Sequence, residues 1–293
     1  MPVYVEPLFR PPSEARSLIF QITVGCSQNR CTFCGMYKMK SFRVRPVAEI
    51  AAEIEEIPAR YRPQIDRVFL ADGDALVYPQ EGLIEILERL AAAFPSLTRI
   101  GAYASPRSLT GKGLEELRAL RGRKLRILYF GLESGDDETL RRIDKGFSAG
   151  EMAELALKAR QAGMKLSVTA ILGLAGATRS LEHARASAAW VNRVSPEYFS
   201  LLTIFHRHND EFVRSLDRCT RRELLLEARE LLLQLRPQRT ILRSNHVSNF
   251  LILEGSYPKD AERLLRTVDE ALVRAGKRPG YLDEVPDYGE DYY

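Results

Sequence analysis

The stretch Gly25-Cys26-Ser27-Gln28-Asn29-Arg30-Cys31-Thr32-Phe33-Cys34-Gly35-Met36-Tyr37 places three cysteines within nine residues. The fourth cysteine, Cys219, lies far along the chain. Cysteines crowded in this way indicate a metal centre rather than disulfides in a chain with no secretory features. The stretch follows an apolar run at residues 18–24, so the expected metal centre lies at the end of a strand.

Two kinds of metal centre fit three close cysteines. Three thiolates and a fourth ligand can hold a structural zinc ion. Three thiolates can also hold a [4Fe–4S] cluster and leave one iron without a protein ligand. The nearest histidine in the sequence is His183, and no second Cys-x2-Cys pair follows. The spacing therefore favours the iron–sulfur cluster at Cys26, Cys31 and Cys34.

Strand-like and helix-like segments alternate outward from this stretch, which is typical of a parallel sheet. The expected strands are short, apolar runs at residues 18–24, 67–71, 99–104, 125–132, 166–172 and 198–205. The expected helices include residues 46–57 and 83–94, and two more that begin at the capping boxes of Ser148 with Glu151 and Thr220 with Glu223. Six such units predict an α/β fold, a partial (β/α)6 barrel of parallel strands with a small C-terminal extension.

Polar or glycine-rich groups follow the expected strands. They are the cysteines, Asp72-Gly73-Asp74, Ser105-Pro106-Arg107, Glu133-Ser134-Gly135, Gly173-Leu174-Ala175-Gly176 and His206-Arg207-His208. The carboxyl ends of barrel strands carry the active sites of such folds. The groups are therefore expected to meet at one rim.

Composition excludes several classes of protein. The chain has 293 residues, 45% hydrophobic and 28% charged, which is usual for a folded globular protein and not for a disordered or collagen-like one. No run approaches the roughly 18 apolar residues of a membrane span. Charged residues interrupt the N-terminus before a signal peptide could form. We therefore expect a cytoplasmic protein with no membrane partner.

The net charge of +4 is unevenly distributed. The last thirteen residues contain no Lys or Arg and five acids: Asp283, Glu284, Asp287, Glu290 and Asp291. The rest of the chain is therefore more basic than the total suggests. An anionic substrate, an acidic protein partner or a nucleic acid would all fit this balance.

The cysteine stretch and the groups after the strands resemble the radical S-adenosylmethionine (radical SAM) family. The family's commonest spacing is C-x3-C-x2-C, and this chain has C-x4-C-x2-C. Asp72-Gly73-Asp74 is similar to the family motif that receives the methionine ammonium, and Glu133 to the acid that binds the ribose. The resemblance implies a cofactor site at Phe33, Asp72, Gly73, Asp74, Ser105, Glu133, Ser167 and Gly173.

The resemblance also implies an activity. A [4Fe–4S] cluster would reductively cleave S-adenosylmethionine, and the resulting 5′-deoxyadenosyl radical would take a hydrogen atom from an unknown, anionic or small-molecule substrate. An acidic electron donor such as flavodoxin or ferredoxin would reduce the cluster. The alternatives are a zinc-stabilised binding protein or an electron-transfer iron–sulfur protein, either of which leaves RNA binding open.

We expect residues 1–17 to form an N-terminal arm, 18–205 the core, 206–280 a substrate-specific extension and 281–293 an acidic tail. Catalytic candidates in the extension are His206, His208, Arg243, Asn245 and His246. The segment 240–250 begins like a strand and then gathers polar side chains, including Asn249. We expect this segment to turn toward the cofactor, although its Asn and Ser could equally serve a turn.

Overall fold

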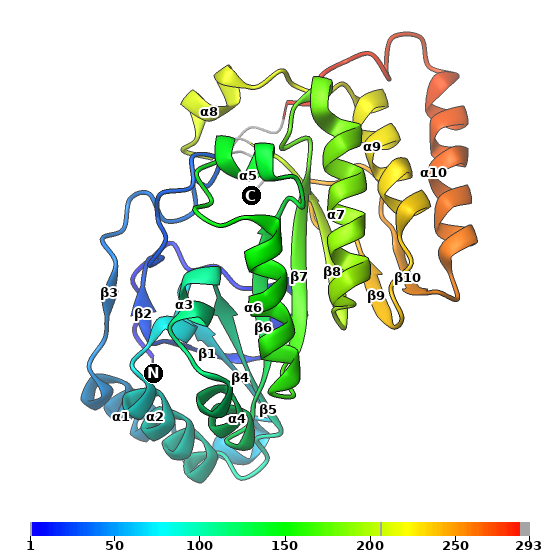
Figure 1. The fold of residues 1–293 in the computed structure, drawn as a ribbon. Helices are drawn as coiled ribbons and strands as arrows, with labels where there is room; N and C mark the ends of the chain where they lie inside the picture. The colour runs from blue at the N-terminus through cyan, green and yellow to red at the C-terminus, as the bar shows by residue number, and fades with distance from the viewer. Residues whose placement is uncertain (1, 206, 288–293) are drawn as a thin grey trace. The chain divides into compact units, whose positions relative to one another are not determined.

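The structure is a computed structural model that describes residues 2–205 and 207–287. Its main sheet has the strand order β1-β4-β5-β6-β7-β8-β9-β10; the pairs from β1 to β6 and from β7 to β9 are parallel, and β9 with β10 is antiparallel (Figure 1). The predicted α/β fold with parallel strands is confirmed. Among the described residues β1 and β10 are the two ends of the order, so the sheet is open, as expected for a partial barrel.

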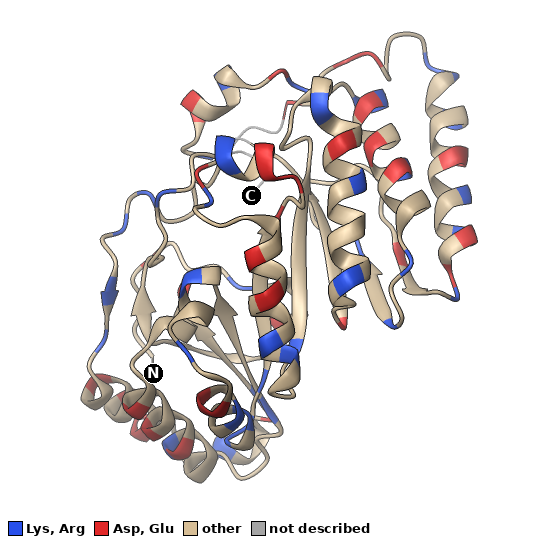
Figure 2. Cartoon of the chain, in the orientation of Figure 1, with Lys and Arg blue, Asp and Glu red and all other residues tan. Residues whose placement is uncertain are grey.

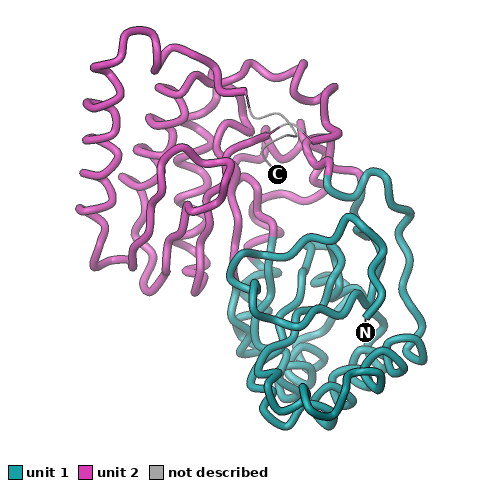
Figure 3. The backbone as a smooth tube through the Cα atoms, turned by 180° about the vertical axis from the view of Figure 1, so that it is seen from behind, with its two compact units in different colours: residues 1–29, 36–130, 154–166 teal, residues 30–35, 131–153, 167–293 magenta. Residues whose placement is uncertain are grey.

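The chain divides into two compact units, which are described separately (Figure 3). Unit 1 comprises residues 1–29, 36–130 and 154–166, and unit 2 comprises residues 30–35, 131–153 and 167–293.

Unit 1 contains the first strands of the main sheet. They are β1 (Leu18–Gln21), β4 (Arg67–Ala71), β5 (Arg99–Ala104) and most of β6 (Leu125–Glu133). Its helices are η1 (Pro12–Glu14), α1 (Val47–Glu55), η2 (Arg62–Gln64), η3 (Ala75–Val77), α2 (Gln80–Ala93), α3 (Pro106–Thr110), α4 (Leu114–Gly122) and most of α6 (Ala149–Gln161). Phe20, Phe69, Ile86 and Phe94 are fully buried here. Their burial forms the core between sheet and helices.

The expected strand at residues 18–24 is divided in two. β1 ends at Gln21, and β2 (Thr23–Val24) pairs antiparallel with β3 (Arg43–Val44) in a separate two-stranded sheet. This small sheet closes the base of the loop that carries the cysteines. The prediction of one continuous strand was wrong because Thr23 and Val24 pair across the loop ends instead of with β4.

Unit 2 contains the later strands. They are β7 (Lys165–Leu172), of which the first two residues belong to unit 1, β8 (Tyr198–Thr203), β9 (Thr240–Arg243) and β10 (Glu254–Tyr257). Its helices are α5 (Asp137–Arg142), η4 (Ala177–Arg179), α7 (Ser180–Val194), α8 (Asp210–Ser215), α9 (Arg221–Gln234) and α10 (Ala261–Gly276). β9 pairs parallel with β8, with Phe199 opposite Leu242. The C-terminal extension therefore adds two strands to the predicted sheet.

The helix boundaries agree with the sequence signals. Both capping boxes form, since Ser148 bonds with Glu151 before α6 and Thr220 bonds with Glu223 before α9. Charged residues lie mostly on the helices and connections, and those of the strands lie at or next to strand ends (Figure 2). No described helix is long and apolar enough to cross a membrane.

Candidate functional site

Asp72 joins the two ends of the cysteine loop in unit 1. Its Oδ2 accepts hydrogen bonds from the backbone N–H of Gly25 at 3.0 Å, from Nε2 of Gln21 at 2.8 Å and from Nζ of Lys40 at 2.8 Å. Gly25 opens the loop and Lys40 lies near its end, and the side chains of Asp72 and Lys40 are both almost fully buried. Asp72 therefore fixes the base of the loop.

The other oxygen of Asp72 has an unused capacity to accept a hydrogen bond. Oδ1 is buried and has no hydrogen-bond partner among the described residues. A buried acceptor without a partner costs free energy, which a cationic donor would relieve. This observation fits the ammonium group that the resemblance assigned to the Asp72-Gly73-Asp74 motif.

Gly73 lies close to Cys26, the first cysteine of the loop, because it has no side chain. A Cβ atom on Gly73 would lie 2.5 Å from Cε2 of Tyr37 and 3.1 Å from Cβ of Cys26. A side chain at position 73 would therefore displace the tyrosine ring or the cysteine. The contact agrees with the expectation that the residues after the predicted strands at 18–24 and 67–71 meet.

Asp74 is held entirely by serines. Its Oδ1 accepts the backbone N–H of Ser105 at 3.0 Å, and its Oδ2 accepts the hydroxyls of Ser105 at 2.7 Å and of Ser27. Burial raises the pKa of Asp74, while these hydrogen bonds act in the opposite direction. Asp74 and Ser105, two residues of the expected cofactor site, are thus in contact, and Asp74 links the ends of β4 and β5 to the cysteine loop.

The second half of the cysteine loop, residues 30–35, belongs to unit 2. Arg30 forms two hydrogen bonds with Asp144, at 2.6 and 2.7 Å, and the backbone N–H of Thr32 donates to the carbonyl of Ile143 at 3.0 Å. The carbonyl of Phe33 accepts Nδ2 of Asn209 at 2.7 Å. Contacts on both sides therefore hold the backbone that carries Cys31 and Cys34.

The three cysteines of the loop suit a cluster by their exposure and by their type. Cys26, Cys31 and Cys34 are all partly exposed. Thiolates are the protein ligands of iron–sulfur clusters, and a partly exposed thiol is accessible to iron. Cys219, in contrast, is buried, and burial raises the pKa of its thiol, so it is a poor ligand.

Glu133 ends β6 in the left-handed region, with φ of 62°. Its Oε1 lies 3.0 Å from Nζ of Lys145, and both side chains are largely buried. A Cβ on Gly131 would lie 2.0 Å from Oε1, so a side chain there would force the Glu133 carboxylate to move. The carboxylate is thus held by a cation and occupies space that a side chain at position 131 would need.

Gly173 begins the turn after β7. Its N–H donates to both carboxyl oxygens of Glu227, at 3.1 and 3.0 Å. Nε2 of His183 lies 3.4 Å from Oε1 of Glu227 without a hydrogen bond between them, and Nδ1 of His183 lies 2.8 Å from Oγ of Ser134. Ser134 follows Glu133, so this buried network connects the residues after β6 to those after β7.

Glu227 and His183 were missed by the sequence analysis. Burial raises the pKa of Glu227 well above its usual range and lowers the pKa of His183 to about 4. One signal was present in the sequence. Glu227 lies on the buried face of α9 that Leu224, Ala228 and Leu231 form, where an acid is unusual.

Ser167 does not join Gly173. Ser167 pairs with Tyr198 at the start of β7, and Gly173 lies six residues further along, beyond the other end of the strand. At about 3.3 Å per residue the two positions are roughly 20 Å apart. The structure therefore separates Ser167 from Gly173, the other residue near this strand that was expected at the cofactor site.

The candidates in the extension are dispersed. His206 lies outside the described residues, and His208 and Asn245 are exposed. Nη2 of Arg243 lies 3.8 Å from Oε1 of Glu254 in the neighbouring strand. His246 stacks on Phe205 with ring centroids 6.1 Å apart, and burial lowers its pKa.

Two residues of the polar segment after β9 form hydrogen bonds with the last residues of β8. Ser248 Oγ accepts the N–H of Thr203 at 3.1 Å, and Asn249 accepts the hydroxyl of Thr203 at 2.8 Å and donates to the carbonyl of Leu201 at 2.7 Å. Ser248 and Asn249 thus pair with polar groups at the end of β8. This is a structural role of the kind that the sequence analysis gave as the alternative to substrate binding.

Comparisons with known proteins agree with the cysteine motif. The family model described as Radical SAM superfamily matches residues 20–187. No curated protein matches the chain. Across residues 2–205 and 207–287, no three His, Cys, Asp or Glu side chains form a group that could hold a metal ion, so Cys26, Cys31 and Cys34 suit a cluster by residue type and exposure and not by a preformed arrangement.

Solved structures show a similar fold at low sequence identity. Coproporphyrinogen III oxidase from Escherichia coli, described as a radical SAM enzyme, has a TM-score of 0.56 and 18% identity over 74% of this chain and 52% of its own. Methylornithine synthase has a TM-score of 0.55 and 14% identity over 86% of this chain and 68% of its own. The chain thus spans about half the length of the first of these proteins.

Proposed function

Because the chain belongs to the radical SAM superfamily, we propose that it is an enzyme that reductively cleaves S-adenosylmethionine and abstracts hydrogen from a substrate. Cys26, Cys31 and Cys34 would hold the [4Fe–4S] cluster. When bound, this cluster supplies an electron that cleaves the cofactor and generates a 5′-deoxyadenosyl radical. The contact of Gly73 with Cys26 carries the proposal, because it joins the cofactor motif to the cluster loop.

The residues of unit 1 would bind the amino end of the cofactor. Oδ1 of Asp72 is the buried acceptor that an ammonium group would satisfy. Both oxygens of Asp74 already accept hydrogen bonds from Ser27 and Ser105, so Asp74 would position the loops instead of binding the ligand. Asp72 would therefore bind the ligand and Asp74 would position the loops, a distinction that the sequence alone did not make.

The residues of unit 2 would bind the nucleoside end. Glu133, held by Lys145, would accept hydrogen bonds from the ribose hydroxyls. Gly173 and the backbone near Phe33 would lie beside the adenine. Lys145 and Glu227 would be positioning residues, since Lys145 contacts Glu133 and Glu227 contacts the N–H of Gly173.

We further propose the division of the chain into a core at residues 18–205 and a substrate-specific extension at residues 206–280. The basic character of the chain supports a small anionic substrate and an acidic electron donor such as flavodoxin or ferredoxin. Membership in the superfamily does not favour the zinc-binding, electron-transfer or RNA-binding alternatives.

Iron and sulfide content tests the cluster assignment. Protein purified and reconstituted without oxygen should contain about four irons and four sulfides per chain. Replacing Cys26, Cys31 or Cys34 by Ala should remove most of the iron, while Cys219→Ala should retain it. Stoichiometric zinc in place of iron, or full iron content in the Cys31→Ala variant, would refute the assignment.

A further inference from the structure

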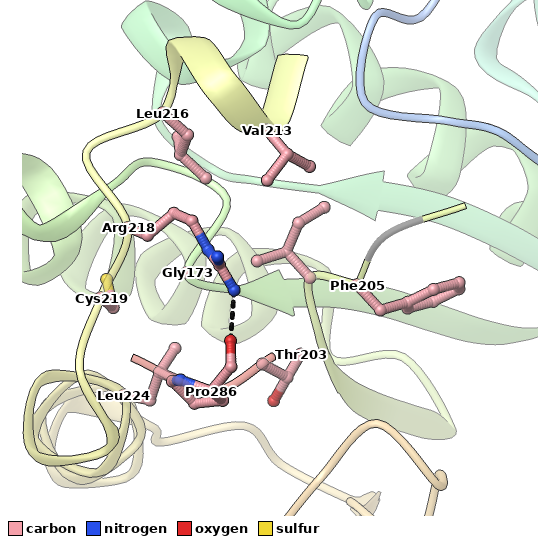
Figure 4. A pocket seen from close by; sticks show the side chains of 10 residues that line it. Gly173, Thr203, Phe205, Val213, Leu216, Arg218, Cys219, Leu224 and Pro286 are labelled. Atoms are coloured by element: carbon pink, nitrogen blue, oxygen red, sulfur yellow. Dashed lines mark hydrogen bonds between the residues drawn. The ribbon is translucent and has the colours of Figure 1, made fainter. Parts of the chain in front are cut away.

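A pocket lies in unit 2 beside the ends of β7 and β8 (Figure 4). The space inside it and at its solvent-open mouth amounts to about 380 Å³, of which only about 20 Å³ is free for the centre of a water-sized molecule. Most of its wall is apolar and includes Ile204, Val213, Leu216 and Leu224. Of the ten residues that line it, Arg218 is the one with a charged side chain. A mostly apolar lining with one charged group resembles that of a small-molecule site, and a ligand larger than water would need part of this wall to move.

We propose that this pocket binds an apolar substrate that bears one carboxylate, with Arg218 as the residue that binds the carboxylate. The proposal rests on the proposed function, because it specifies the substrate class of the same enzyme. A single guanidinium matches one carboxylate in charge and in hydrogen-bonding geometry. The apolar side chains would cover the rest of the molecule.

A backbone carbonyl now occupies the place of the carboxylate. The guanidinium of Arg218 donates a hydrogen bond to the carbonyl of Pro286, with Leu216 and Val213 on one side and Leu224 on the other (Figure 4). A carbonyl is a weaker acceptor for arginine than a carboxylate. A carboxylate substrate would therefore displace Pro286 from Arg218.

Pro286 belongs to a segment, residues 281–287, that we call the C-terminal strap. The strap lies along the start of α9, where the backbone N–H of Arg222 donates to Leu282 at 2.9 Å and that of Arg221 donates to Glu284 at 3.0 Å. Leu282 is buried. The strap is thus attached before Pro286, so Pro286 can leave Arg218 without detachment of the whole segment.

The wall that carries Arg218 is fixed by the preceding residue. The carbonyl of Asp217 accepts the N–H of Ala177 at 2.7 Å, and its Oδ2 accepts the hydroxyl of Thr178 at 2.7 Å. Both partners lie just after β7. A prearranged wall reduces the entropy that is lost when a ligand binds.

The part of the wall formed by α8 and the residue after it is linked to the cysteine loop. Val213 and Leu216 lie on or just after α8, and Asn209 before this helix donates to the carbonyl of Phe33 at 2.7 Å. Gly173, which lines the pocket, is also the residue proposed to lie beside the adenine. A substrate in the pocket would therefore lie next to the residues of unit 2 that serve the cofactor.

Octanoate and its neutral counterpart octanamide can test the pocket by isothermal titration calorimetry on the anaerobic holoprotein. Arg218→Gln should weaken octanoate binding about ten-fold, the loss expected for one charge-assisted hydrogen bond, and should leave octanamide binding unchanged. Arg214→Gln, a matched change on the exposed side of α8, should alter neither affinity. Equal octanoate affinity in the wild type and in Arg218→Gln would overturn the proposal.

Removal of the residues after Glu284 provides a second test. Because Pro286 competes for Arg218, the shortened chain should bind octanoate several-fold more tightly, and unchanged or weaker binding would contradict the proposal. Competition between octanoate and saturating S-adenosylmethionine would also overturn it, since the pocket would then belong to the cofactor.

The two proposals fail in different ways. If the wild type forms 5′-deoxyadenosine but its octanoate binding does not depend on Arg218, the pocket assignment is wrong and the enzymatic function stands. If octanoate binding depends on Arg218 but no 5′-deoxyadenosine forms, the carboxylate site is supported and the radical function fails.

Discussion

Nε2 of His183 lies 3.4 Å from Oε1 of Glu227, and both side chains are fully buried. The pair connects Ser134, next to the proposed ribose acid, with Gly173, next to the proposed adenine site. Because solvent does not reach either group, the contribution of the pair to stability depends on whether each group is charged or neutral. Their proton content therefore gives a prediction about stability and pH.

The native pair should lose stabilising free energy as the pH rises above 6.5. Burial raises the pKa of Glu227 and lowers that of His183, against a weaker opposite effect of Asp136, so the folded pair retains one proton. In the unfolded chain Glu227 is ionised above pH 4.5 and His183 is neutral above pH 6.5. The unfolded state then binds fewer protons, and stability falls by up to about 1.4 kcal/mol per pH unit.

Glu227→Gln should remove this dependence. Anaerobic urea unfolding between pH 6.5 and 8.5 would measure the free energy of unfolding of both proteins. Glu230→Gln, a control on the same helix, should keep the wild-type slope. Parallel pH profiles for the wild type and Glu227→Gln would show that Glu227 is ionised in the native protein.

Gly73→Ala should lower iron content and stability. The new Cβ would overlap with the ring of Tyr37 and press on Cys26, and such overpacking costs about 1–3 kcal/mol. Gly122→Ala at the end of α4 is the matched control, because nothing lies within 4 Å of its new Cβ. Wild-type iron content in Gly73→Ala would show that the motif and the cysteine move independently.

Lys40→Met should destabilise unit 1 strongly. Removing one partner of the buried Lys40–Asp72 pair leaves an uncompensated charge, at a cost of about 3–5 kcal/mol in the free energy of unfolding. Lys38→Met, two residues earlier and exposed, should change it little. Adding Asp72→Asn to Lys40→Met should restore part of the loss, and chemical denaturation of all four proteins would show whether it does.

Glu133→Gln should weaken S-adenosylmethionine binding and leave iron content unchanged. The amide has the shape of the carboxylate but loses the charge that Lys145 stabilises, which corresponds to about 1–3 kcal/mol for a charged hydrogen bond. Calorimetric titration of the reconstituted protein measures this affinity. Glu138→Gln, an exposed change on α5, is the control, and equal affinities of the two variants would remove Glu133 from the cofactor site.

Local sequence patterns predicted the strands that are buried and apolar and the helices that begin with capping boxes. β10 could not be predicted in this way, because its sequence Glu254-Gly255-Ser256-Tyr257 has no apolar run and it is a strand only through pairing with β9. The division of the first strand similarly depends on β3, which lies beyond the whole cysteine loop in the sequence. Such elements are determined by long-range pairing rather than by local propensity.

The site could be predicted where residues follow strands, and less well where partners come from elsewhere. Gly73 with Cys26, and Asp74 with Ser105, meet as the shared rim of parallel strands requires. The partnership of Lys40 with Asp72 joins residues 32 positions apart, and no sequence spacing indicates it. The only sequence signal for a buried Glu227 was its position among the apolar residues of one face of α9.

Formation of 5′-deoxyadenosine from S-adenosylmethionine tests the central claim most directly. Reconstituted protein reduced with dithionite without oxygen should form 5′-deoxyadenosine and methionine in equal amounts, detected by liquid chromatography and mass spectrometry. The Cys26→Ala, Cys31→Ala and Cys34→Ala variants should form neither product. A wild-type protein with a full cluster and bound S-adenosylmethionine that yields no 5′-deoxyadenosine, even with candidate carboxylate substrates, would contradict the account.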